Sequence, residues 1–121
     1  MGAYTEVFLR TKLKCNLNSD IESVFSFLFN NGDKPALIPE HAFFDCCNWH
    51  KFGRCSYSNF QTFSYISEGY LCSRFDVKVV DQDIDKFFDW IEPYIDKNEQ
   101  DSICIGWYWS EKEPQPELVF M

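Results

Sequence analysis

Five side chains that could bind a metal ion lie close together between residues 41 and 55. They include both histidines of the chain and are His41, Cys46, Cys47, His50 and Cys55. Thiolate and imidazole are the ligands that zinc prefers, and four of them in a tetrahedral array form a structural site. The spacing lacks paired Cys-x-x-Cys units, so the alternative is that these cysteines pack as small apolar side chains among aromatic neighbours. The segment is thus a candidate zinc- or small-ligand-binding region, and no other cofactor is indicated.

The same segment could form a catalytic site. Asp45, Cys47 and His50 are the residue types of an orienting group, a nucleophile and a base. A nucleophilic cysteine needs an electropositive environment, and Lys51 and Arg54 are the only bases of this segment. The sequence contains no recognisable motif of a nucleophile with its base, so we expect a binding protein and not an enzyme. The first alternative is the zinc- or small-ligand-binding region, and the second is an enzyme with a Cys/His site.

The negative charge of the chain is concentrated in its last third. Residues 1–75 hold seven acids and seven bases, whereas residues 76–121 hold twelve acids and four lysines. The whole net charge of −8 therefore comes from residues 76–121. A field of one sign repels nucleic acid and anionic membranes and attracts basic partners. We therefore expect a basic protein partner, with neither nucleic acid nor membrane as a ligand.

The acids of this region fall into two groups. Asp81, Asp83, Asp85 and Asp89 surround the start of a predicted helix, where the helix dipole favours negative charge. Their segment lacks the glycine and the final glutamate of a calcium-binding loop, so we do not expect calcium there. The helix start does not explain the acids further along the chain, for which solubility is the alternative explanation. We expect these acids, with one tyrosine as an aromatic anchor, to contact the partner. The predicted docking residues are Asp96, Glu99, Asp101, Tyr108, Glu111 and Glu113.

Three consecutive aromatic residues, Trp107, Tyr108 and Trp109, lie on a predicted strand. Side chains alternate between the two faces of a strand, so both tryptophans are expected in the core and Tyr108 on the opposite face. A stacking platform for single-stranded nucleic acid needs basic residues between its aromatics, whereas the sequence neighbours here are acidic.

The elements that position these residues follow from hydrophobic periodicity. Alternation predicts strands over residues 4–14, 56–66, 70–80, 102–109 and 118–121. A helix should begin at Ser19, with Ser19 and Glu22 as a capping box, and end at Gly32. A second helix should begin near Asp81 or Asp83 and end near Pro93. Residues 33–55 are predicted to be irregular, with a short helix around 39–45.

This order predicts an α+β fold. The expected architecture is a ferredoxin-like two-layer sandwich: a mainly antiparallel sheet, two helices on one face, and an extra C-terminal strand. The length of 121 residues indicates a single domain over residues 1–121.

Location and assembly are also predicted from the sequence. The first residues lack the basic start and apolar run of a secretion signal, so the protein is expected in the cytoplasm, with its six cysteines free or metal-bound. An unpaired edge strand would allow a homodimer as well as a monomer. Together these features indicate a small acidic binding module, an inhibitor or immunity-type protein that neutralises a basic partner.

Overall fold

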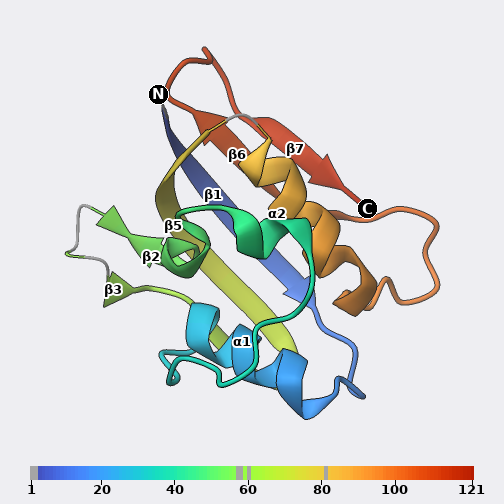
Figure 1. Cartoon of the computed structure of the whole chain (residues 1–121). Helices are drawn as coiled ribbons and strands as arrows, with labels where there is room; N and C mark the ends of the chain where they lie inside the picture. The colour runs from blue at the N-terminus through green and yellow to red at the C-terminus, as the bar shows by residue number, and fades with distance from the viewer. Residues whose placement is uncertain (1–2, 57–58, 60, 81) are drawn as a thin grey trace.

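The chain folds as an α+β protein, as predicted from its sequence. The computed structural model describes residues 3–56, 59, 61–80 and 82–121 (Figure 1). The strands are β1 (Ala3–Lys12), β2 (Arg54–Cys55), β3 (Gln61–Thr62), β4 (Tyr65–Ser67), β5 (Tyr70–Val79), β6 (Cys104–Ser110) and β7 (Glu117–Phe120). The α-helices are α1 (Ser19–Phe29) and α2 (Asp83–Ile91), and the 3₁₀ helices are η1 (Ala42–Asp45), η2 (Trp49–Lys51) and η4 (Glu92–Tyr94).

Five of these strands form one antiparallel sheet in the order β4-β5-β1-β6-β7. The central strand β1 pairs with β5 along its whole length, from Ala3 opposite Val79 to Lys12 opposite Tyr70, and with β6 on its other side. β2 and β3 form a separate two-stranded sheet. The single strand predicted over 56–66 is wrong, because β3 and β4 are separate strands; residues 57, 58 and 60 lie outside the described part.

One face of the five-stranded sheet is buried and the other is exposed. Along β1, Val7 and Leu9 are fully buried, whereas Tyr4 and Arg10 alternate with them on the exposed side. Both α-helices lie over the buried face (Figure 1). This alternation is the pattern of an antiparallel sheet that is covered on one side only.

Helix α1 occupies the predicted segment but is capped by different residues. The side chain of Asn18 accepts a hydrogen bond from the backbone amide of Ile21 (3.0 Å), so Asn18 is the N-cap and Ser19 is already helical. At the other end Asn31 adopts the left-handed conformation expected of Gly32. The predicted caps were therefore wrong by one residue at each end, because asparagine can serve both functions.

Helix α2 begins at Asp83 and continues without a break into η4, which contains Pro93. Its predicted end near Pro93 is confirmed, and the predicted start at Asp83 is confirmed as well. The alternative start, Asp81, lies outside the described residues. In the described ranges, no helix is long and apolar enough to cross a membrane.

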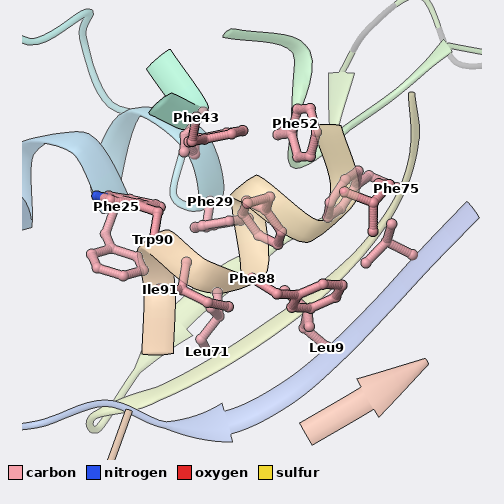
Figure 2. Close-up of a cluster of buried hydrophobic side chains, with 14 of the residues drawn as sticks. Leu9, Phe25, Phe29, Phe43, Phe52, Leu71, Phe75, Phe88, Trp90 and Ile91 are labelled. Carbon is pink, nitrogen blue, oxygen red and sulfur yellow. The ribbon is translucent and has the colours of Figure 1, made fainter. Parts of the chain in front are cut away.

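Aromatic side chains fill the core between the helices and the sheet (Figure 2). The irregular segment contributes two fully buried rings, Phe43 from η1 and Phe52. The Phe43 ring lies 5.3 Å from that of Phe87 and 5.6 Å from that of Trp90, both on α2. Residues 33–55 are therefore partly held by the core itself.

A β-bulge reverses the predicted orientation of the three consecutive aromatics. The pairing of β6 with β7 shifts register between Cys104 and Gly106. A Cβ atom at Gly106 would lie 1.9 Å from the carbonyl oxygen of Phe8, so only glycine fits there. One extra residue shifts the alternation of the strand, which turns Tyr108 toward the helices and both tryptophans, Trp107 and Trp109, to the exposed face. The prediction of buried tryptophans was wrong for this reason.

Candidate functional site: an acidic groove between α2 and β7

The exposed side of α2 presents a row of carboxylates. Asp85, Asp89 and Glu92 are four and three residues apart, which places them on one face of the helix and its 3₁₀ extension. They line a groove of about 310 Å³ whose opposite side is formed by β7 and includes Glu117. We call this site the acidic groove.

Phe88, Tyr108 and Phe120 are the aromatic residues that line the acidic groove. The ring centroids of Phe88 and Tyr108 are 6.0 Å apart, and the hydroxyl of Tyr108 donates a hydrogen bond to the carboxylate of Glu117. Burial, this hydrogen bond, and the negative charges of Glu117 and Asp85 raise the pKa of Tyr108 above its ordinary value. Tyr108 therefore stays a hydrogen-bond donor at neutral pH and fixes the position of one carboxylate.

Two of the carboxylates already have a basic side chain as a partner, yet they stay accessible. Asp89 lies 3.0 Å from Nε2 of His41, and its side chain is 75% exposed. Because Nδ1 of His41 accepts a hydrogen bond from the amide of Phe43, the proton on Nε2 is available to Asp89. Glu92 pairs with Lys97 at 3.2 Å, whereas Asp85 forms no ion pair within the described part of the chain. The groove therefore presents partly compensated negative charge.

The docking residues predicted from the sequence do not lie together. Asp96 is at one end of β1, where its amide donates to the carbonyl of Lys12 (2.8 Å), and Glu111 is at the other, where its amide donates to the carbonyl of Tyr4 (3.0 Å). Eight residues of extended strand separate Tyr4 from Lys12, which is roughly 27 Å.

The other predicted docking residues divide between these two ends. Glu99 and Asp101 lie in the loop between η4 and β6, and Glu113 lies in the β6–β7 turn. Tyr108 contacts the acidic groove between them. Of the six predicted residues, only Tyr108 therefore belongs to the site described here.

The predicted metal ligands are also spread over different elements. His41 contacts α2 through Asp89, while Cys55 is buried with its sulfur 3.4 Å from the carbonyl oxygen of Arg74 on β5. Cys46 is buried, and Cys47 and His50 are exposed. Among the described residues, no group of three histidine, cysteine or acidic side chains could hold a metal ion. The zinc hypothesis and the enzyme hypothesis for this segment stay predictions.

In the same segment, the pKa of one cysteine is raised and the pKa of one histidine is lowered. Burial raises the pKa of Cys46 to about 11, and a hydrogen bond to Asp83 and the negative charge of Asp83 contribute to the same shift. Burial and the positive charge of Lys51 lower the pKa of His50. At neutral pH Cys46 is therefore a thiol and not a thiolate, which makes it a weak nucleophile.

The spacing of the acids in the sequence already indicates the acidic groove. The helix dipole explains Asp85 and Asp89 as acids near a helix start, but with Glu92 they also follow the helical period. Glu117 could not be assigned from the sequence, because its place opposite α2 depends on the pairing of β6 with β7.

The exposed face of the five-stranded sheet is a second surface of note, and we call it the open face. It includes seven of the eleven exposed large hydrophobic side chains recorded for the described residues. They are Tyr4, Phe8, Tyr65, Tyr70, Trp109, Leu118 and Phe120. At its centre the rings of Phe8 and Trp107 stack with centroids 5.9 Å apart and planes inclined by 13°.

Comparison with protein-family models, with curated proteins and with solved structures shows no match to this chain. The acidic groove and the open face are therefore the features from which a function can be inferred.

Proposed function

We propose that the protein is a binding module that docks on a basic protein partner through the acidic groove. One observation supports this proposal above the others: four carboxylates, from Asp85, Asp89, Glu92 and Glu117, line a single groove together with three aromatic residues. An inhibitor or immunity-type protein that neutralises a basic partner would use such a surface.

The groove suits lysine and arginine side chains for two reasons. Their aliphatic stems can pack on Phe88 and Tyr108 while their charged ends reach the carboxylates. A guanidinium or ammonium group can also reach Asp89 and Glu92, because their side chains stay 75% and 49% exposed beside their existing partners, His41 and Lys97. The surrounding negative field would accelerate encounter with a basic partner at low salt.

We further propose that the fold is a ferredoxin-like two-layer plait with an added C-terminal strand. The strand order β4-β5-β1-β6-β7 supports this, because removing β7 leaves two β-α-β units with their strands interleaved. A single hydrophobic cluster supports one domain. Cys15, Cys46, Cys47, Cys72 and Cys104 are free thiols, which fits the cytoplasm, where thiols stay reduced.

A pair of matched variants tests the docking proposal. The double variant Asp85→Asn/Asp89→Asn removes two charges from the groove, and Glu99→Gln/Asp101→Asn removes two charges outside it. With a lysine-rich peptide as the probe, calorimetry at low salt should show about tenfold weaker binding for the groove variant, equivalent to two modest ion pairs. The second variant should bind nearly as the wild type does. Equal losses for both variants would mean that net charge alone attracts the peptide, and the groove proposal would fail.

A further inference from the structure

The open face is too apolar to be explained as solvent-exposed surface alone. Scattered exposed hydrophobic residues are ordinary, but contiguous apolar patches on one side of a sheet mark an interaction site. The exposed fraction is 59% for Leu118 and 62% for Phe120 on β7, and 42% for both Tyr4 on β1 and Trp109 on β6. These strands are adjacent, so the side chains form one surface.

The charges of the open face disfavour a polyanionic ligand. Arg74, beside Phe8 on the neighbouring strand, is bound to Glu6 at 2.8 Å, and Lys12 lies 3.8 Å from Asp96. Two of its bases are therefore already neutralised, and the whole chain has a net charge of −8. Nucleic acid would be repelled at long range and would find few free cations at contact.

The local charges of the open face, unlike the net charge of the chain, fit a second copy of the chain. The acidic groove lies on the helical side of the sheet, so two copies can approach through their open faces with these carboxylates kept apart. On β1, Glu6 and Arg10 lie two residues before and two residues after Phe8. A two-fold axis in the plane of contact, perpendicular to β1 and crossing it at Phe8, would bring Glu6 of each copy, together with the Arg74 bound to it, opposite the partner's Arg10.

The size of the open face fits a small dimer interface. Its five strands of three to ten residues, at about 3.4 Å per residue and about 4.8 Å apart, cover roughly 550 Å². A specific interface of standard size buries about 800 Å² on each partner, so two open faces would form a smaller and weaker contact of roughly 1,100 Å² in total. Two sheets that pack face to face with nearly aligned strands form such a contact.

We infer that the protein forms a symmetric dimer through its open faces, with Phe8 and Trp107 at the centre of the contact. This assembly leaves the carboxylates of both acidic grooves free for a basic partner, because they lie on the helical side of the sheet. Its failure would leave the docking proposal untouched, since of the side chains that form the open face only Leu118 and Phe120 also line the groove.

Sedimentation velocity or light scattering across the micromolar range tests the dimer. Wild-type protein should have the mass of two chains. Trp107→Lys, which places two ammonium groups near the symmetry axis, should have the mass of one. Arg10→Glu places an acid opposite Glu6 of the second copy and should raise the dimer dissociation constant at least tenfold. Leu37→Lys changes an exposed apolar residue outside the sheet and should stay dimeric. Circular dichroism of each variant establishes that it is folded.

Three results would overturn the inference. The first is wild-type protein with the mass of a single chain throughout the concentration range. The second is a folded Trp107→Lys variant that keeps the mass of two chains, which would indicate pairing through an edge strand instead. The third is wild-type protein that binds nucleic acid through Phe8 and Trp107 as a single chain.

Discussion

Tyr108 links the aromatic core to the acidic groove, because its ring packs on Phe88 and its hydroxyl donates to Glu117. The pKa of Tyr108 is raised above the ordinary 10.0 by burial and by Glu117. The protonated hydroxyl therefore stabilises the folded state fully below pH 10, and this contribution declines as pH rises through the raised pKa.

The expected effect is pH-dependent. At pH 7 Tyr108→Phe should lower the free energy of unfolding by about 1 kcal/mol, the net value of one hydrogen bond. In urea titrations at higher pH, the difference from wild type should shrink as the pH rises above 10. Tyr70→Phe, on the open face, is the control for loss of a hydroxyl. A difference that stays constant with pH would show that the hydroxyl of Tyr108 titrates alike in both states.

Cys46 and Cys47 are adjacent in sequence but differ in reactivity. Cys46 is buried and its pKa is raised to about 11, whereas Cys47 is exposed. At pH 8 iodoacetamide should therefore modify Cys47 at least tenfold faster, as measured by mass spectrometry of peptides. In urea both should react at similar rates. Equal rates in the native protein would contradict the burial of Cys46.

At the scale of elements, the bulge in β6 determines which aromatic side chains face solvent. Gly106→Ala should destabilise the protein by more than about 2 kcal/mol, because the added methyl group meets backbone of β1, which cannot move aside. Gly69→Ala is the control: its φ is +82° but no atom lies within 4 Å of the added Cβ, so only about 1 kcal/mol of backbone strain is expected. Equal stabilities of the two variants in urea would contradict the close approach at Gly106.

The irregular segment should behave as part of the core. Phe43 in η1 is fully buried against α2, so Phe43→Ala should cost about 3–5 kcal/mol. Leu37→Ala, in the same segment but 63% exposed, should change stability little. Unfolding in urea measures both. A small effect at Phe43 would mean that residues 33–55 are dispensable for folding.

Elements with strong periodicity could be predicted from the sequence, and features that depend on tertiary contacts could not. The stripe of Ile84, Phe87 and Ile91 predicts α2, and alternation predicts β1 and β5. The bulge was missed because the reason for Gly106 is a carbonyl of β1, far away in sequence. Glu117 was missed because only strand pairing brings it to α2.

At the scale of the whole molecule, charge and apolar surface are segregated. The carboxylates of the acidic groove lie with α2 and β7, and the exposed aromatics lie across the sheet on the open face. Such segregation allows one surface to attract a basic partner while the other joins two copies. Because exposed charges are screened by salt, association with a basic partner should slow as ionic strength rises.

The most direct test of the account is an NMR titration of the protein with a lysine-rich peptide at low salt. The acidic groove predicts that the largest shifts of backbone amides fall on residues 85–92 and 117–121, with saturation. Largest shifts at residues 96–101 or 111–113 would contradict it, because those acids lie at the two ends of the sheet and outside the groove.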